Sequence, residues 1–452
     1  MSRNCRTFGF LLKKSRKNIT IKEKGYSKGL IMAGTSIIRS KDVYNIIRKT
    51  LGIMDVKVMQ HGEVTAYFLY KMLQADGTYG AQELADYTMI GMMHDIGMIK
   101  TGYAKDMVER ETKGVWAHSI YGYLFLRYLS PIGDKAEIVL YHHLPYRLHN
   151  LIKSQYLKIT EYLSLADKMD MFLHAEGHDM GKDYFVKNVN VEFSPRAVEI
   201  FNKAQAKFHL MEHLKDGSYL EELDTLLTNA HFPEKYKKGF LEMLIYSIDF
   251  RSQQTVVHTL ATTTFALELG RLMRVPTKDL QVLYYGALLH DIGKIAIPLD
   301  ILEAPRRLTD EEMRVMKAHV IISEKILRGV IDEEVLEVAI RHHEKLDGTG
   351  YHRGLKGEEL TRLQRTVAVA DILSALYGKR SYKDSFDPEK IKSILRGDAQ
   401  AGKICPKIVD FAVGNFDSII RNYEKQRTNT LGIYETILEQ YDIIYERFKI
   451  YE

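Results

Sequence analysis

The chain has 452 residues, of which 45% are apolar and 27% charged, and this composition is ordinary for a globular protein of two or three domains. No run of about 18 apolar residues occurs, so we expect no transmembrane helix. Two cysteines, Cys5 and Cys405, are too few for a disulfide framework and suit a reducing cytoplasm. Nine prolines, with frequent Leu, Ile, Glu and Lys, favour helices over strands.

Residues 1–31 differ from the rest, with nine Lys or Arg and one acidic residue, a net charge of +8. Because the whole chain has a net charge of +5, residues 32–452 have a net charge of −3. The positive charge of the chain is therefore confined to residues 1–31 and does not indicate a nucleic-acid-binding surface. We interpret this segment as a disordered tail, or as an upstream extension if translation starts at Met32. A weak anchor for anionic lipid is the alternative.

Residues 33–60 are expected to form a helix, with Ser40 as its N-cap. Histidines and aspartates then recur within apolar segments. They are His61, His94, Asp95, His118, His142, His143 and Asp167. Buried imidazoles and carboxylates are costly unless they are paired or bind metal, so a set of this size indicates a metal site.

Residues 171–250 are expected to link this set to a second one. The pairs His174/His178 and His209/His213 have the i,i+4 spacing of zinc ligands on a helix. No clear third ligand accompanies either pair, so we interpret them as packed or solvated histidines.

A second set of the same kind follows the linker. It comprises His258, His290, Asp291, His319, His342, His343 and Asp371. Imidazole with carboxylate suits Fe, Mn, Co, Ni or Zn, and the lack of cysteine excludes a thiolate site. Two bound ions can activate a water and clamp a phosphoryl group. Lys294 follows Asp291 by three positions, a spacing that places both on one helix face.

The two sets form an internal repeat. The lone histidine precedes the His-Asp dipeptide by 33 residues in the first set and 32 in the second, and the dipeptides are offset by about 195 residues. The copies differ at two places: Met98 stands where Lys294 stands, and the first copy lacks the loop at 347–351. All seven candidate ligands are nevertheless present in the first copy.

Two local patterns surround the second set. Thr309 and Glu312 predict a capping box for the helix that carries His319. The segment Asp347-Gly-Thr-Gly350 is expected to be a loop, because its two glycines disfavour helix. We interpret this loop as a place where backbone approaches substrate; termination of a helix is the alternative.

Residues 250–415 resemble the HD-GYP branch of the HD phosphohydrolase superfamily. The residues that carry the resemblance are His258, HDIGK at 290–294, His319, HHEKLDGTGY at 342–351, Asp371 and RSYK at 380–383. The resemblance implies an all-helical domain that uses two or three iron or manganese ions to hydrolyse cyclic dinucleotides, chiefly cyclic di-GMP.

The resemblance also implies roles for individual residues. One ion would be held by His258, His290, Asp291 and Asp371. A second ion, bridged by Asp291, would be held by His319, His342 and His343. Asp291 and Lys294 would be the catalytic residues, with Lys294 touching the scissile phosphate. The substrate would be contacted by Lys294, Gly348, Gly350, Tyr351, Arg380 and Lys383.

The chain departs from the family pattern at two positions. His352 replaces the proline of the name-giving triplet, and this leaves the loop shape and the substrate choice open. Gln254 stands where three-metal members have a glutamate, so we expect two metals.

We therefore predict an all-α fold with two tandem HD-type domains and a C-terminal helix. The expected parts are the tail 1–31, a degenerate HD domain at 32–250, an HD-GYP domain at 251–415 and an amphipathic helix at 416–452. We expect the first domain to be a metal-bearing regulatory or dimerising domain, and the last helix to pack on its own domain rather than form a coiled-coil dimer.

The predicted activity is metal-dependent hydrolysis of cyclic di-GMP to the linear 5′-phosphorylated dinucleotide, with GMP as a further product, in the cytoplasm. Cyclic GMP-AMP (3′3′-cGAMP) is an alternative substrate, because of His352 and the intact first copy. The sequence is also compatible with a non-catalytic metal- or nucleotide-binding signalling module, and with a mononucleotide or (p)ppGpp phosphohydrolase. We expect no duplex nucleic acid as a partner, and a homodimer is left open.

Overall fold

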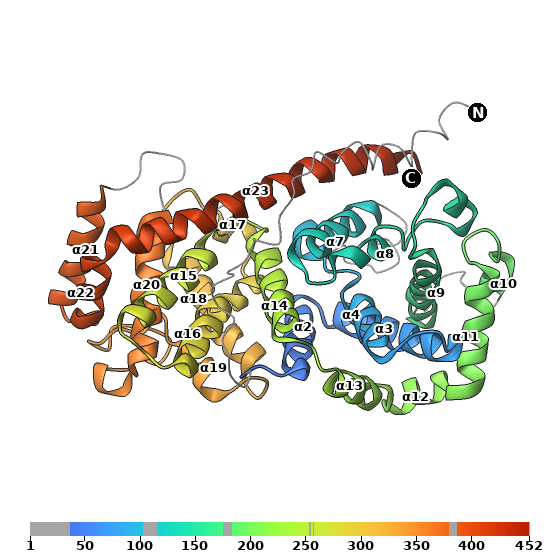
Figure 1. Ribbon diagram of the computed structural model, residues 1–452, viewed down its shortest axis with the longest axis horizontal. Coiled ribbons are helices and arrows are strands. Elements are labelled where there is room, and N and C mark those ends of the chain that lie inside the picture. Colours follow the sequence, from blue (N-terminus) through green and yellow to red (C-terminus); the bar gives the residue numbers. More distant parts are fainter. Residues whose placement is uncertain are drawn as a thin grey trace. The chain divides into compact units, whose positions relative to one another are not determined.

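The computed structural model describes residues 37–102, 115–174, 183–252, 255, 257–378 and 387–451. Over these ranges the secondary structure is helical, with two isolated β-bridges and no strand (Figure 1). The all-α prediction is therefore confirmed. Within the same ranges, no helix combines the length and the hydropathy needed to cross a lipid bilayer.

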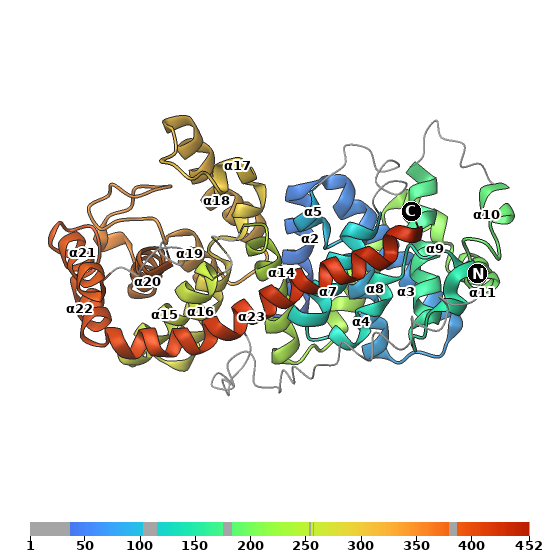
Figure 2. The ribbon, with the colours of Figure 1, turned by 90° about the horizontal axis from the view of Figure 1, so that it is seen from above.

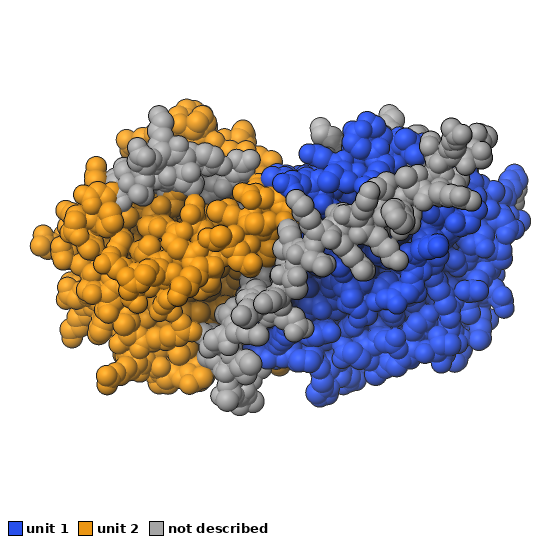
Figure 3. Space-filling model, turned by 45° about the horizontal axis from the view of Figure 1, so that its top comes forward, with its two compact units in different colours: residues 1–23, 55–243, 437–452 blue, residues 24–54, 244–436 orange. Residues whose placement is uncertain are grey.

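The chain divides into two compact units, which Figure 3 shows in different colours. The first comprises residues 1–23, 55–243 and 437–452, and the second residues 24–54 and 244–436. These bounds differ from the predicted domain bounds at both ends of the chain. The difference arises because residues 40–54 pack on elements of the second unit, and because the last turns of the C-terminal helix pack on the first.

The first unit is built around a long central helix, α3, which packs against α4, α9, α11 and α13. The elements up to the linker are α3 (Val56–Asp76), α4 (Ala81–Met93), α5 (Met98–Thr101), α7 (Val115–Leu129), η1 (Gly133–Lys135), α8 (Glu137–Leu140), η2 (Tyr146–Leu151) and α9 (Leu157–His174). Those of the linker are α10 (Asp183–Lys187), α11 (Pro195–Phe208), α12 (Leu210–Asp216), α13 (Tyr219–Asn229) and α14 (Glu234–Asp249), of which residues 244–249 belong to the second unit.

The second unit repeats this plan, with α15 packed between α16 and α20. Its elements are α2 (Ser40–Met54), α15 (His258–Leu272), α16 (Thr277–Leu289), η3 (Ile292–Ala296), α17 (Leu299–Leu302), α18 (Asp310–Leu327), α19 (Glu333–Ile340), η4 (Gly357–Glu359), α20 (Arg362–Gly378), α21 (Pro388–Gln400) and α22 (Pro406–Gly414). The predicted capping box is present, since Thr309 Oγ1 accepts a hydrogen bond from Glu312 N and the Glu312 carboxylate accepts one from Thr309 N.

A glycine holds the His-Asp turn of each unit against the next helix. A Cβ atom on Gly293 would lie 2.0 Å from the carbonyl oxygen of His319, and one on Gly97 would lie 1.9 Å from that of His118. No side chain fits at such a distance, so only glycine lets the turn reach the helix that supplies the next histidine ligand. Ser323 adds a hydrogen bond from Gly293 N in the second unit.

The predicted first helix over 33–60 is two helices in the structure. Residues 33–36 lie outside the described residues, α2 ends at Met54, and α3 begins at Val56. The break is at Asp55, whose extended backbone and side chain cap α3 through a 2.8 Å hydrogen bond from Lys57 N. An acceptor at this position satisfies one of the free N–H groups of the new helix and thereby favours the break.

The C-terminal helix α23 (Phe416–Phe448) is followed by the short helix η5 (Lys449–Tyr451). Apolar residues on one face of α23 are buried: Ile437, Ile444 and Phe448 are at most 5% exposed. In the first unit, Phe448 packs on Trp116 with ring centroids 4.7 Å apart, and the last turns run along α7 and α8 (Figure 2). The prediction that the helix packs on its own domain is therefore wrong for its last turns, which pack on the first unit.

Candidate metal centre

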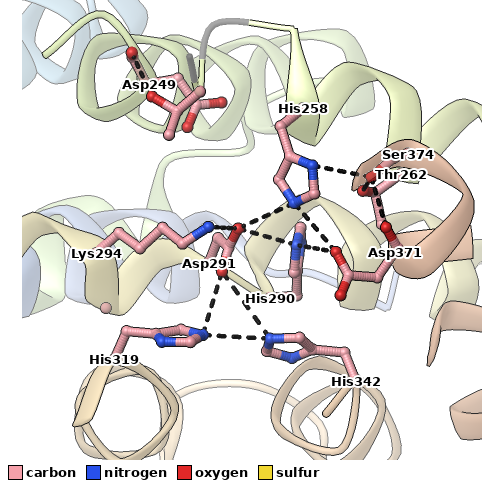
Figure 4. A network of polar contacts seen from close by, with 12 residues as sticks. Asp249, His258, Thr262, His290, Asp291, Lys294, His319, His342, Asp371 and Ser374 are labelled. Atoms are coloured by element: carbon pink, nitrogen blue, oxygen red, sulfur yellow. Dashed lines mark hydrogen bonds and ion pairs between the residues drawn. The ribbon is translucent and has the colours of Figure 1, made fainter. Parts of the chain in front are cut away.

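The structure brings the seven predicted ligands of the second unit into one group, most of which Figure 4 shows; five are buried, and His258 and His343 are half-buried. Four elements supply six of them. His258 opens α15, His290 and Asp291 follow α16, His319 lies in the middle of α18, and the pair at 342–343 follows α19. The seventh, Asp371, lies in α20.

Asp291 lies at the centre of this group, and its two oxygens face different histidines. Oδ2 is 3.4 Å from His258 Nε2 and 3.1 Å from His290 Nε2. Oδ1 is 3.3 Å from His319 Nε2 and 3.9 Å from His342 Nε2. A carboxylate placed in this way can bridge two ions, each with imidazole ligands of its own.

Asp371 closes the group on one side. Its Oδ1 is 3.0 Å from His258 Nε2 and 3.7 Å from His290 Nε2, and its Oδ2 is 3.7 Å from His343 Nδ1. Asp371 therefore reaches histidines on both sides of Asp291.

Backbone carbonyls fix the tautomers of the histidines. The Nδ1 atoms of His290, His319 and His342 lie 2.6, 2.6 and 2.7 Å from the carbonyl oxygens three residues earlier. Each ring therefore donates through Nδ1 and directs the Nε2 lone pair inward. His319 Nε2 and His342 Nε2 lie 3.3 Å apart, and Asp291 Oδ1 accepts no hydrogen bond from the described residues. Lone pairs that face one another in a buried space fit the coordination of cations.

The electrostatics of the group also favour a cation. Burial alone would raise the pKa of Asp291, but the charges of His290 and Lys294 hold it well below its usual value. Burial likewise opposes the protonation of His290, yet the charge of Asp291 raises the pKa of this imidazole to about 10. The carboxylates of Asp291 and Asp371 thus attract either a proton or a metal ion. The proton and the ion compete for the same lone pair of an imidazole.

Lys294 lies next to the central carboxylate. Its Nζ donates a 2.5 Å hydrogen bond to Asp291 Oδ2, and its side chain is 17% exposed. Arg251 holds the turn that carries this lysine, because its guanidinium donates to the carbonyl oxygens of Lys294, Ile295 and Ile297. The ammonium therefore keeps a fixed position beside the metal ligands.

The loop after His343 is fixed by side chains that the sequence did not single out. Glu344 accepts hydrogen bonds from the backbone N–H groups of Arg353 and Leu355 at 2.7 and 2.9 Å. Glu324 pairs with His352 at 3.2 Å and also with Arg353. These carboxylates hold the loop although it lacks the proline of the family pattern.

The predicted substrate residues of this loop have definite places. Gly348 adopts a φ of 79°, which favours glycine, and a Cβ on Gly350 would lie 2.4 Å from the backbone nitrogen of Lys345, so there is no room for a side chain there. The ring of Tyr351 lies 4.6 Å from that of His343, and the ammonium of Lys317 lies 5.0 Å from the Tyr351 ring. Tyr351 therefore borders the metal ligands.

The first unit gathers its own seven predicted ligands in the same manner. His61 Nε2 is 3.0 Å from Asp167 Oδ1 and 3.2 Å from His94 Nε2. Asp95 Oδ1 lies 3.4 Å from His118 Nε2. Further His-His contacts join His142 and His143 to this group. Among the described residues, three overlapping sets of ligand atoms are each compact enough to hold an ion: His61, His94 and Asp167; His94, Asp95 and His142; and His118, His142 and His143.

Comparison with known proteins identifies the second unit. A family model described as HD domain matches residues 242–407. Over these residues the chain is similar to the HD domain family. Several curated relatives come from Vibrio cholerae. The 3′3′-cGAMP-specific phosphodiesterase 1 is 25% identical over 400 residues, which is 84% of this chain and 92% of that protein. The 3′3′-cGAMP-specific phosphodiesterase 3 is 29% identical over about half of each chain.

Another relative is the cyclic di-GMP phosphodiesterase response regulator RpfG of Xanthomonas campestris, 33% identical over 40% of this chain and 53% of that protein. The chain thus spans nearly the whole length of one relative and about half of the other two. Among solved structures, the cyclic GMP-AMP-specific phosphodiesterase V-cGAP3 of V. cholerae matches with a TM-score of 0.52 and 18% identity, over 84% of this chain and 98% of that one. This match confirms the fold.

The predicted substrate residues Arg380 and Lys383, and Gln254, which replaces the glutamate of three-metal members, lie outside the described residues. A further residue near the ligands was also not singled out by the sequence. Asp249 is buried near the HD domain ligands, in the region of Lys294 and His258 (Figure 4). Burial, together with the charge of Asp291, raises the pKa of Asp249 to about 7. The signal that could have revealed it is an acid within the apolar segment Tyr246–Phe250.

Proposed function

We propose that the C-terminal HD domain is a metal-dependent phosphodiesterase that hydrolyses a cyclic dinucleotide to its linear 5′-phosphorylated form. The observation that carries this proposal is the placement of Asp291 between two groups of imidazoles, with Lys294 bound to the same carboxylate. A pair of ions next to a fixed ammonium suits a phosphodiester, whose negative charge grows during attack by water.

Two groups of residues would hold the ions. Asp291 would be shared, with His258, His290 and Asp371 on one side and His319, His342 and His343 on the other. Imidazole and carboxylate ligands without thiolate suit iron or manganese. When bound, two such ions supply Lewis acidity and activate a water at neutral pH. We infer two ions rather than three because Gln254 is a neutral amide.

The chain's own groups have distinct roles in this proposal. Asp291 orients Lys294, whose ammonium would contact a non-bridging oxygen of the scissile phosphate. Carbonyl groups three residues before the histidines hold the rings so that their lone pairs stay directed inward. The aromatic ring of Tyr351 and the ammonium of Lys317 border the site where the rest of the substrate would lie.

Two substrates are candidates. Cyclic di-GMP is the expectation from the family resemblance, and several relatives are phosphodiesterases for it. The extent of the matches supports 3′3′-cGAMP as the second candidate. The relative that spans 84% of this chain, and so both units, is specific for that nucleotide, whereas RpfG covers only 40%. His352, which replaces the family proline, adds to this second candidate.

The test is turnover of both dinucleotides by one sample of the protein, purified without oxygen and loaded with iron or manganese. The proposal expects at least one of them to be hydrolysed, and the ratio of the two kcat/KM values assigns the substrate. The Asp291→Ala variant should bind no ions in this domain and should have no activity. Metal binding without hydrolysis of either nucleotide would favour the non-catalytic signalling module instead.

We further propose that the protein acts in the cytoplasm with a cyclic dinucleotide as its partner and without duplex nucleic acid. Its two cysteines suit a reducing compartment, and the basic charge is confined to residues 1–31. Whether two copies of the chain associate can be measured by light scattering on the same sample.

A further inference from the structure

The ligand group of the second unit is accessible to solvent at two of its histidines. The side chains of His258 and His343 are 17% and 28% exposed, whereas those of the other five ligands are at most 8% exposed. A molecule that comes from solvent therefore meets the ligands at these two histidines.

A lysine lies beside each exposed histidine. Lys294 Nζ donates to Asp291 Oδ2, and the same oxygen lies 3.4 Å from Nε2 of the first exposed histidine. Next to the second one, the ring of Tyr351 lies 4.6 Å from that of His343, and Lys317 Nζ lies 5.0 Å from the centre of the Tyr351 ring. Two ammonium groups thus border the accessible part of the ligand group, and the proposed function assigns a contact to only one of them.

The charge of Lys317 is available to a ligand. Among the described residues no carboxylate forms an ion pair with it, whereas Arg314, one turn earlier on α18, pairs with Glu311 at 2.7 Å. The face of an aromatic ring attracts a cation only weakly at an exposed site, so Tyr351 holds the ammonium in place without cancelling its charge. An ammonium held in this way can still bind an anion.

Both lysines are replaced by buried apolar residues in the first unit. Lys294 corresponds to Met98, and Lys317, two residues before the histidine of α18, corresponds to Trp116, two residues before the histidine of α7. Met98 and Trp116 are each 2% exposed. The side chains of the two histidines that match the exposed ones are only 2% and 3% exposed. The two charges thus occur together with an accessible ligand group, as expected if both contact the same substrate.

The proposed substrate has two negative charges in one ring. A cyclic dinucleotide is closed by two phosphodiester groups, and only one of them is hydrolysed at the ions. The ions and Lys294 would meet the scissile diester. The second diester needs a cation of its own, because a charged phosphate that leaves water without a partner is costly to bind.

We propose that Lys317, held against the Tyr351 ring, is a specificity-determining residue that binds the non-scissile phosphodiester of a cyclic dinucleotide. This inference rests on the proposed function and deepens it, because it accounts for the selection of a substrate with two diesters over one with a single diester. Lys317 acts in addition to the substrate residues that the family resemblance implies, and it takes no part in the activation of water.

The test compares two substrates with the variant Lys317→Met, which keeps the length of the side chain and removes its charge. One substrate is the cyclic dinucleotide that the unaltered protein hydrolyses, and the other is bis(p-nitrophenyl) phosphate, which has a single diester. For the cyclic dinucleotide, KM should rise about 10-fold with kcat unchanged, the factor expected when a hydrogen bond to a charged group is lost from substrate and transition state alike. The kcat/KM for bis(p-nitrophenyl) phosphate should not change.

Two further variants serve as controls. Arg314→Met removes a charge from the same helix that is already paired with Glu311, so both substrates should be hydrolysed as by the unaltered protein. Lys317→Arg keeps the charge and should keep KM close to its original value. Metal content and thermal unfolding, measured for every variant, show whether the ions and the fold are retained.

The outcomes separate this inference from the proposed function. An unchanged KM of Lys317→Met for the cyclic dinucleotide, or an equal loss of activity on both substrates, would overturn the role of Lys317 and leave the proposed function standing. Failure of the unaltered, metal-loaded protein to hydrolyse either substrate would overturn the proposed function, and the role of Lys317 with it.

Discussion

Lys294→Met reproduces in the second unit the residue that the first unit has at the equivalent position, Met98. The substitution removes the ammonium whose Nζ lies 2.5 Å from Asp291 Oδ2, and it keeps a long apolar side chain at a position that is 17% exposed. The metal ligands themselves are unchanged. The variant therefore separates the contribution of the charge from that of the ions.

The magnitude follows from the position of the ammonium. A preorganised donor aimed at the charge that develops in a transition state contributes about 3 kcal/mol, which corresponds to a loss of kcat on the order of 100-fold. Metal content should not fall, because the negative charge of Asp291 is then less compensated and attracts a cation more strongly.

The assay is steady-state hydrolysis of the cyclic dinucleotide, together with elemental analysis of the same samples. Met98→Lys is the matched control and should change kcat little, since we place catalysis in the second unit. An unchanged kcat for Lys294→Met would refute the role of this lysine. A fall in kcat that full metal loading restores would show that the lysine acts through metal retention.

Three further predictions concern the fold and the ions. Gly293→Ala should destabilise the protein by more than about 2 kcal/mol, because the new Cβ would lie 2.0 Å from a carbonyl oxygen. Gly397→Ala is the control: this position lies in open space within α21, so the substitution should stabilise the protein by about 0.5 kcal/mol. Thermal unfolding of the two variants measures both effects. Mn²⁺ affinity should rise with pH between about 6.5 and 8.5, because the ion displaces a proton from His290, whose pKa is raised to about 10. An affinity that stays constant over this range would contradict the competition between the ion and the proton. Phe448→Ala should lower stability by about 3 kcal/mol, since the ring is buried, and a loss below about 1 kcal/mol would contradict the packing of the last helix.

The metal ligands could be predicted because their chemistry is visible along the sequence. Imidazoles and carboxylates within apolar segments, repeated in the same order, have few explanations other than a shared site. The spacing from the next His-Asp dipeptide alone indicates that His61 and His258 are equivalent positions. The structure places each of them in its own group of ligands.

Other features depend on tertiary proximity and could not be predicted. Asp170 is one acid among many in a helix until the fold brings it to His61, and Asp249 becomes part of the site environment only through the packing around α15. The break at Asp55 was missed because a single cap outweighs the helix propensity of its neighbours. α2 belongs to the second unit because it packs against η3 and α18. Nothing in the sequence of α2 itself indicates these contacts.

Hydrolysis in water enriched in ¹⁸O tests the central claim most directly. The protein, loaded with metal, is incubated with each cyclic dinucleotide, and the products are analysed by mass spectrometry. The account predicts a linear dinucleotide with one ¹⁸O atom in its 5′-phosphate, absent when Asp291 is replaced by alanine. Recovery of both cyclic dinucleotides intact from a fully loaded sample would contradict it.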